Sequence, residues 1–320
     1  MVIWRDVLAE EKSRFWAKID QRLHFFDFFF GFVELARVRS NLGFDPMMKE
    51  IAAETPLPLE IRWSGVTDAG RFRKNNEDAF LALNFDAKEL RYLGKEGEGS
   101  MELNDYVFAV SDGMGGAKAG EVASKIAVEK ITRLLPASFR QGATGMDAGF
   151  ADVLGEIFSE TDEALRELGT NYEECRGMGA TLSLCWFMPG WMTFGHVGDS
   201  RIYYLPREGE MKQVSEDHSL VGERRRKGQL TELQARMHPQ RSVLTQVLGG
   251  GSARLEPQIG RVGCVPGDRF LICSDGLVDG LFDRRINDMA RESFSAPALV
   301  EYAVEESGRD NTTALMVEVR

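Results

Sequence analysis

Acidic residues recur in this sequence where short apolar runs end, and their types and spacing could do chemistry. Two segments echo each other, because FAVSDGMGG and FLICSDGL each place Ser-Asp-Gly after an apolar run, at Asp112 and Asp275. The other acids in such places are Asp199 in GHVGDSR, Glu77 and Asp78 in NNEDAF, and Asp310 in GRDNTT. A carboxylate at the end of a strand is held by the sheet yet faces solvent, and a following glycine allows a tight turn.

Oxygen ligands gathered from several strand ends suit Mg²⁺ or Mn²⁺ rather than zinc. Converging carboxylates repel one another unless cations lie between them. Two metal ions roughly 3.5–4 Å apart would neutralise such a group and hold a phosphoryl group. Each acid taken alone is more simply explained as a turn residue or helix cap, since Asp-Gly is a common turn dipeptide. The hypothesis of a metal site therefore depends on all the acids together.

The elements that would position these acids are short strands and separate blocks of helix. Apolar, β-prone runs predict strands at 61–67, 78–84, 106–110, 179–187, 191–198, 200–205, 254–262, 269–274 and 312–319. Helical composition and spacing predict helices at 120–135, 147–168, about 283–292 and about 296–306. Because the strands come in hairpin-like series and the helices in blocks, the sequence predicts an α+β fold with antiparallel sheets.

A domain boundary is predicted near residue 60, because Asp45-Pro46 interrupts any helix and ETPLPLE (54–60) has the composition of an extended linker. Before it lies a phenylalanine-rich stretch, LHFFDFFFGFVELARV (23–38), which is too short and too interrupted to span a membrane. We expect residues 1–60 to pack on the main domain or on a second copy of the chain. Binding to a partner protein or to a membrane surface remains an alternative.

The composition excludes several classes of protein. The chain has 320 residues, 43% of them hydrophobic and 28% charged, which is typical of a soluble globular protein. Its net charge of −11 argues against nucleic acid as a partner. The four cysteines form no CxxC pair and no secretory leader opens the chain, so we expect free thiols in the cytoplasm. The four histidines are scattered, which argues against zinc.

With these motifs in this order, residues 61–320 resemble the metal-dependent protein phosphatases, the type 2C serine/threonine class, in its bacterial form. TDAGRFRKNNEDAF is similar to the opening motif of that family, and VSDGMGG to its first metal motif. The central strands of the family match GATLSLCWF and GHVGDSRIYYL in this chain. The segment around its flap matches SEDHSLV and HPQRSVLTQVLGG, and its closing motifs match CSDGL and DNTT. The resemblance implies two central antiparallel sheets between helix layers (αββα), a flap insert at about 217–243, and residues 1–60 as a helical N-terminal extension.

The resemblance also implies a set of metal ligands for two Mn²⁺ or Mg²⁺ ions. Asp112 would bridge both ions, and Asp275 and Asp310 would complete one of the two sites. Glu77 and the carbonyl of Gly113 would help to hold the second ion, largely through waters.

Further positions match residues with other roles in the family. Asp199, with Asp275, matches the site of a third and weaker metal ion. Asp78 would orient a metal-bound water, and Arg73 matches the phosphate-binding arginine, whose forked guanidinium suits a phosphate dianion. Arg71 is interpreted as a solvated loop cation and Arg201 as a structural salt-bridge partner.

The implied reaction is direct hydrolysis of phosphoserine and phosphothreonine, in which a hydroxide bridging two metals attacks phosphorus in line, without a covalent intermediate. The catalytic residues would be Arg73, Asp78 and Asp112. Met114 stands where animal members carry a histidine, so the general acid is unassigned, with a metal-bound water preferred over His218. His196, within an apolar strand, is expected to be a hydrogen-bonded core residue, and the cysteines are expected to serve in packing.

Three functions follow from these hypotheses. The first is a metal-dependent phosphoprotein phosphatase that acts on proteins modified by a serine/threonine kinase, or on the kinase itself. The second is a non-catalytic pseudophosphatase that binds phosphopeptides as a regulator, which predicts lost metal ligands. The third is a small-molecule phosphatase or a nuclease, which shares the carboxylate chemistry but not the order of the motifs. The ligand positions are intact at Glu77, Asp112, Asp275 and Asp310, which favours the first.

Overall fold

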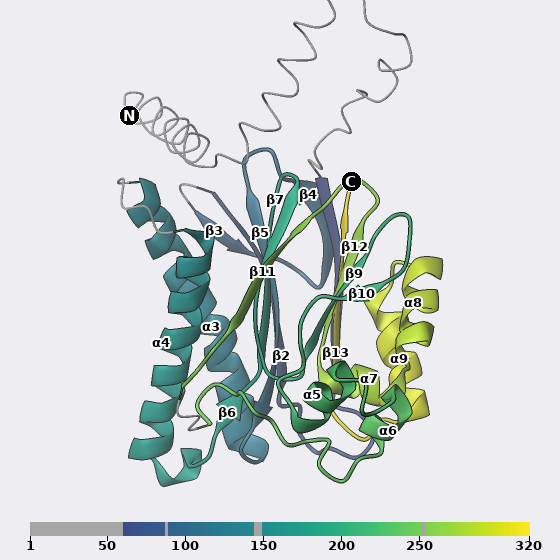
Figure 1. Ribbon diagram of the computed structural model, residues 1–320. Helices are drawn as coiled ribbons and strands as arrows, with labels where there is room; N and C mark the ends of the chain where they lie inside the picture. Colours follow the sequence, from purple (N-terminus) through teal and green to yellow (C-terminus); the bar gives the residue numbers. More distant parts are fainter. Residues whose placement is uncertain (1–59, 87–88, 144–148, 251–253) are drawn as a thin grey trace, which may run out of the picture. The chain divides into compact units, whose positions relative to one another are not determined.

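A computed structural model describes residues 60–86, 89–143, 149–250 and 254–320. In this part of the chain, two antiparallel β-sheets pack face to face between helices (Figure 1). The α+β fold with its αββα layers, predicted from the sequence, is thereby confirmed. The predicted helical extension lies outside the described residues, and β1 begins at Glu60. Of the helices described, none is both long enough and apolar enough to cross a membrane.

Both sheets are antiparallel throughout. The first sheet has the order β10 (Lys212–Gln213), β9 (Arg201–Leu205), β12 (Arg269–Cys273), β13 (Thr312–Val319), β1 (Glu60–Asp68) and β4 (Glu96–Ser100). The second has the order β11 (Gln258–Gly263), β8 (Trp191–Val197), β7 (Leu182–Met188), β5 (Asp105–Met114), β2 (Asp78–Phe85) and β3 (Leu90–Tyr92), with β6 (Gly179–Ala180) paired to β5.

Long helices cover the outer faces of the sandwich. The second sheet is covered by α3 (Ala117–Ala143) and α4 (Phe150–Asn171), and the first by α8 (Asp283–Glu292) and α9 (Ala296–Glu306) (Figure 1). Shorter helices follow β12 or lie in the flap insert: α7 (Asp275–Gly280), α5 (Leu220–Arg226) and α6 (Glu232–Arg236), with a 3₁₀ turn at Glu173–Cys175. The flap insert predicted at about 217–243 therefore contains two short helices joined by loops.

Aromatic side chains fill the space between the two sheets. Phe187 of β7 meets Phe270 of β12 edge to face at 5.1 Å between ring centroids, and Phe108 meets Phe187 at 5.7 Å. All three rings are fully buried. Each buried ring contributes about 2–3 kcal/mol of hydrophobic stabilisation, so this layer fixes the sheets against each other. The strand ends that carry the acids are held in place by that packing.

Two local structures differ from their sequence-based predictions. The glycine-rich segment 94–100, for which no strand was predicted, contributes β4 on the edge of the first sheet. Its glycines allow a close approach, because a Cβ on Gly97 would lie 2.3 Å from the Trp63 ring. The two Ser-Asp-Gly segments also diverge in backbone: Asp112 lies within β5, whereas Asp275 begins α7.

Candidate active site

Five aspartates from separate elements converge at one end of the sandwich. The antiparallel register of β2 and β5 places Asp78 opposite Asp112. Asp199 lies in the turn between β8 and β9, Asp275 begins α7 directly after β12, and Asp310 lies just before β13. Asp78, Asp275, Asp199 and Asp310 each act electrostatically on Asp112 and raise its pKa. The fold therefore brings together acids that are far apart in sequence.

Asp78 joins the two sheets through one carboxylate oxygen. Its Oδ2 accepts hydrogen bonds from Ser274 Oγ at 2.7 Å and from Thr313 Oγ1 at 2.6 Å, and both donors belong to the first sheet's side of the site. Its Oδ1 is buried and has no hydrogen-bond partner, and the same is true of Asp275 Oδ1. An unpaired carboxylate oxygen in a buried position costs free energy unless a donor or cation meets it.

The electrostatics of this group are those of buried like charges. Burial, with a smaller contribution from nearby carboxylates, raises the pKa of Asp78 to about 6 and that of Asp199 to about 7, although hydrogen bonds to these carboxylates act in the opposite direction. The pKa values of Asp112 and Asp275 lie well above the ordinary range for the same two reasons, burial first and neighbouring aspartates second. Cations between these side chains would remove the repulsion.

The donor set fits hard divalent cations, because every candidate ligand is an oxygen and two buried oxygens have no partner. Among the described residues, no three acidic, histidine or cysteine side chains stand at the spacing of direct coordination to one ion. The side chains thus converge without supplying a complete coordination sphere for an ion. Cations held there would keep part of their coordination for water or substrate, as Mg²⁺ and Mn²⁺ sites commonly do.

Glu77 lies beside this group, against the first turn of α3. A Cβ on Gly120 would come within 2.3 Å of Glu77 Oε2, and a Cβ on Gly113 would lie 2.0 Å from the Gly120 carbonyl oxygen. Both glycines are therefore required by close packing. The Glu77 N–H donates to Asn311 Oδ1 at 2.7 Å, which fixes the backbone at this point. Burial is the first cause that raises the pKa of Glu77.

Arg73 supplies positive charge at the edge of the acidic group. Its Nη2 lies 2.7 Å from Asp310 Oδ2, and half of its side chain is exposed to solvent. Arg71 is an exposed loop residue, in line with its interpretation as a solvated loop cation, but its guanidinium also has backbone partners. Its Nε donates to the Val304 carbonyl at 2.8 Å, and its Nη2 also donates to the Glu305 carbonyl, so it caps the end of α9.

The other polar residues singled out in the sequence have structural partners. Arg201 pairs with Asp217 at 2.7 Å, which confirms its interpretation as a salt-bridge residue. His196 is fully buried and hydrogen-bonded, as expected of a core residue. His218 Nδ1 accepts a hydrogen bond from the Gly198 N–H at 3.2 Å, and burial lowers its pKa. His218 thus supports the turn that carries Asp199.

Sequence reasoning missed the neutral residues that hold the acids. Ser274 and Thr313 donate to Asp78, Thr181 Oγ1 accepts from the Asp112 N–H at 2.9 Å, and Asn311 holds Glu77. A clue was available, because hydroxyl or amide residues directly precede or follow the acids in CSDG and DNTT.

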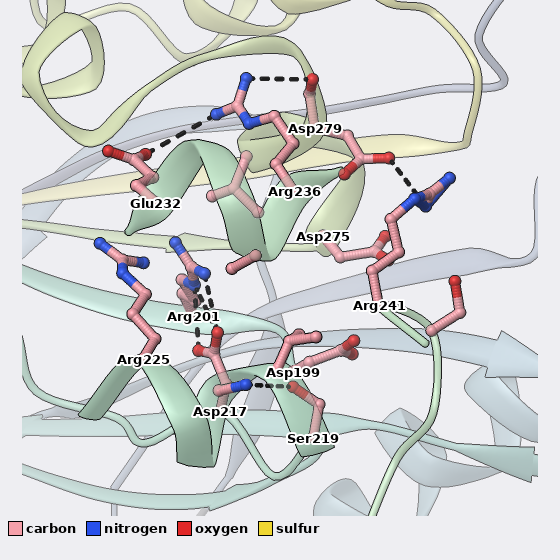
Figure 2. A pocket seen from close by; sticks show the side chains of 15 residues that line it. Asp199, Arg201, Asp217, Ser219, Arg225, Glu232, Arg236, Arg241, Asp275 and Asp279 are labelled. Atoms are coloured by element: carbon pink, nitrogen blue, oxygen red, sulfur yellow. Dashed lines mark hydrogen bonds and ion pairs between the residues drawn. The ribbon is translucent and has the colours of Figure 1, made fainter. Parts of the chain in front are cut away.

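A pocket opens beside the acids and is closed from the other side by the flap insert. Figure 2 shows Asp199, Asp275 and Asp279 in this pocket together with Arg225 and Arg236, which belong to the flap helices. Acidic and basic walls meet here, so the pocket can hold groups of mixed charge. It extends the candidate site from the aspartates to the flap.

Comparison with known proteins gives consistent matches to one family. The family model described as protein phosphatase 2C matches residues 100–314. The chain is 30% identical over 267 residues to the serine/threonine protein phosphatase PstP of Mycobacterium tuberculosis, which covers 82% of this chain and 45% of PstP. It is 32% identical over 265 residues to the protein phosphatase PhpP of Streptococcus pneumoniae, covering 79% of this chain and 96% of PhpP. The chain thus spans less than half the length of PstP.

Solved structures give the same result. The crystal structure of the M. tuberculosis phosphatase PstP aligns with a TM-score of 0.64 at 30% identity, over 82% of this chain and 100% of that one. A structure of the PstP catalytic domain in complex with two manganese ions aligns with a TM-score of 0.63 at 28% identity, over 82% and 99% of the two chains.

Proposed function

The chain belongs to the protein phosphatase 2C family, and on this premise we propose that it is a metal-dependent phosphatase of phosphoserine and phosphothreonine residues in proteins. The observation that carries the proposal is the convergence of aspartates at one end of the sandwich, in which Asp78 and Asp275 each keep a buried oxygen without a partner. A group of this kind needs cations, and cations beside an arginine suit a phosphoryl substrate. Phosphorylated proteins, and a kinase that produces them, are the partners that this activity requires.

Asp112, Asp275 and Asp310 would hold one Mn²⁺ or Mg²⁺ ion, with water taking the coordination positions that these side chains do not reach directly, and Asp112 would also serve a second ion. Glu77 and the Gly113 carbonyl help to hold that second ion. The two ions together would supply a bridging hydroxide as the nucleophile and offset charge on the phosphoryl group. Asp199, with Asp275, is the proposed site of a third ion, and the pocket of Figure 2 adjoins it.

The protein's own groups orient the reactants around these ions. Asp78 is held by two hydroxyl donors at Oδ2, so its free Oδ1 is fixed in place and available to accept a hydrogen bond from an attacking water. Arg73 is exposed enough to bind a substrate phosphate with its free guanidinium nitrogens while it contacts Asp310. Met114 has no proton to donate, so no side chain of the site is assigned as the general acid for the leaving alcohol.

The test is release of phosphate from a phosphothreonine peptide by the full chain with Mn²⁺. We expect activity that EDTA abolishes and that Asp275→Asn lowers roughly a hundredfold or more, as when one fixed electrostatic group is lost. Asp288→Asn, on α8, is the matched control and should retain activity. Undiminished turnover by Asp275→Asn would refute the two-metal assignment. Tight phosphopeptide binding without turnover would instead indicate the pseudophosphatase.

A further inference from the structure

Thr181 lies directly across from Asp112 in the second sheet, between β6 and β7. The antiparallel register of β5 with β7 continues unbroken into its pairing with β6, which places Thr181 opposite Asp112. Residues that face each other across antiparallel strands carry their side chains on the same side of the sheet. Asp78 faces Asp112 from the neighbour on the other side, β2. Asp78, Asp112 and Thr181 thus form one row across the sheet.

The hydroxyl of Thr181 takes the place of a backbone acceptor. The Thr181 N–H donates to the Asp112 carbonyl at 2.8 Å. In a regular antiparallel pair, the Asp112 N–H would donate to the Thr181 carbonyl in return. That carbonyl instead accepts from Ser111 Oγ at 2.6 Å, and the Asp112 N–H donates to Thr181 Oγ1 at 2.9 Å. The backbone of Asp112 is therefore held by a side chain.

The same hydroxyl also binds the turn that carries Asp199. Thr181 Oγ1 and Ser200 Oγ are hydrogen-bonded at 2.7 Å, and both side chains are buried. Gly198, on the other side of Asp199, packs against Thr181. Its φ is +112°, and a Cβ there would lie 2.5 Å from Thr181 Cβ. One hydroxyl thus contacts the backbone of Asp112 and the residue that follows Asp199.

This pair of hydroxyls acts on the position of the acids. Thr181 binds the backbone of Asp112 and the hydroxyl of Ser200, so it affects the two carboxylates through their separation. Asp199 acts electrostatically on Asp112, and the strength of that repulsion depends on the distance between them. Cations offset such repulsion only where the ligands are correctly spaced. Residues that orient metal ligands in this way change metal affinity about ten- to a hundredfold when they are lost.

We propose that Thr181 and Ser200 are positioning residues that fix Asp112 relative to Asp199 and thereby set the affinity of the site for divalent cations. The inference rests on the proposed metal-dependent function. Because neither residue would contact an ion or the substrate, loss of the hydroxyls should raise the Mn²⁺ concentration that the enzyme requires. The rate at saturating Mn²⁺ should stay that of the wild type.

The experiment measures the Kd of Mn²⁺ for the full chain by isothermal titration calorimetry. Thr181→Val keeps the shape of the side chain but removes the hydroxyl, and it should weaken Mn²⁺ binding about tenfold. Thr181→Ser retains a hydroxyl and should restore the wild-type affinity. Thr193→Val is the matched control, because Thr193 is buried in β8 and its Oγ1 has no hydrogen-bond partner among the described residues. Its Kd should equal that of the wild type.

A double-mutant cycle tests whether the two hydroxyls act as one unit. Ser200→Ala should weaken Mn²⁺ binding less than Thr181→Val does. The double variant should bind Mn²⁺ as Thr181→Val alone, because the Ser200 hydroxyl acts through that of Thr181. Phosphate release gives a second measure: Thr181→Val should reach the wild-type rate once the Mn²⁺ concentration is raised about tenfold.

An unchanged Kd in Thr181→Val would contradict the inference and leave Thr181 with a structural role only. An equal loss of affinity in Thr193→Val, multiplied losses in the double variant, or a wild type that binds no Mn²⁺ would also contradict it. If Thr181→Val does not fold, Ser200→Ala decides, since weaker Mn²⁺ binding supports the inference and an unchanged Kd opposes it. The expected shifts in Kd without phosphate release would support the inference and count against the proposed function instead.

Discussion

We predict that the substitution His196→Gln makes the folded state less sensitive to acid. The imidazole is fully buried, and its Nε2–H donates to the carbonyl oxygens of Gly198 at 3.0 Å and Glu216 at 3.1 Å. Its Nδ1 lies 2.8 Å from Ser183 Oγ. One N–H thus joins the turn that carries Asp199 to the residue that precedes the flap.

Burial, together with the neighbouring His218, lowers the pKa of His196 from 6.5 to about 3, although Asp217 and the two carbonyls act in the opposite direction. Because the pKa in the folded state is the lower one, the unfolded chain binds the proton first. The contribution of His196 to stability is therefore complete above pH 6.5 and is lost as the pH falls toward about 3. Each pH unit in that window costs about 1.4 kcal/mol, which gives about 2 kcal/mol at roughly pH 5.

The assay is urea unfolding of the wild type and of His196→Gln at about pH 7.5 and about pH 5. Glutamine can still donate toward the two carbonyls but does not titrate, and the titration of carboxylates is common to both proteins. The free energy of unfolding of the wild type, relative to that of the variant, should fall by about 2 kcal/mol between the two pH values. Parallel losses of stability in the two proteins would show that this imidazole is not held neutral by burial.

Three further predictions concern the site itself. Arg73→Ala should raise KM for a phosphopeptide with little change in kcat, because the arginine binds ground state and transition state alike; a fall in kcat at constant KM would contradict this. Mn²⁺ at about one hundred times its Kd should stabilise the protein by about 2.7 kcal/mol in thermal unfolding. Asp112→Asn should lose that stabilisation, and an equal shift in the variant would exclude Asp112 as a ligand. Arg236→Gln should increase tryptic cleavage of the flap about tenfold, because Arg236 holds the flap to the end of α7. Its guanidinium donates to two carbonyls there and lies 3.8 Å from the centre of the Phe282 ring. Lys227→Gln removes only an exposed pair within α5 and should leave the cleavage rate unchanged.

The sequence sufficed for the longer strands and, through the order of its motifs, for the convergence of the acids. A strand leaves a local signal in the sequence, because its buried positions require apolar or β-branched residues. Strands such as β1, β2 and β13 were therefore predictable to within a residue or two. The positions of Asp112 and Asp275 at the ends of apolar runs followed from the same patterns. Their proximity could be expected only from the order of all the motifs together.

The partners of individual side chains could not be predicted, because they come from distant parts of the chain. The Arg71 side chain binds carbonyls at residues 304 and 305, and nothing in its neighbourhood in the sequence indicates an open helix end there. β4 was missed because its glycines lower β-propensity, while the rings of Trp63 and Tyr106, which need that space, belong to other strands. Such contacts follow from tertiary packing and leave no periodic pattern.

The position of Asp78 connects the stability of the sandwich to the chemistry of the site. One of its oxygens takes hydrogen bonds from Ser274 and Thr313, across the line where the two sheets meet, and the other is left free. The packing of the sheets therefore holds in place a carboxylate whose burial is unfavourable on its own. Since the aromatic core between the sheets supplies the free energy that keeps these strand ends together, weakening that core should lower metal affinity before it unfolds the chain. A cavity variant such as Phe270→Leu, far along β12 from Asp275, tests this: its Mn²⁺ affinity should fall while its fold is retained, and unchanged affinity would separate the site from the core.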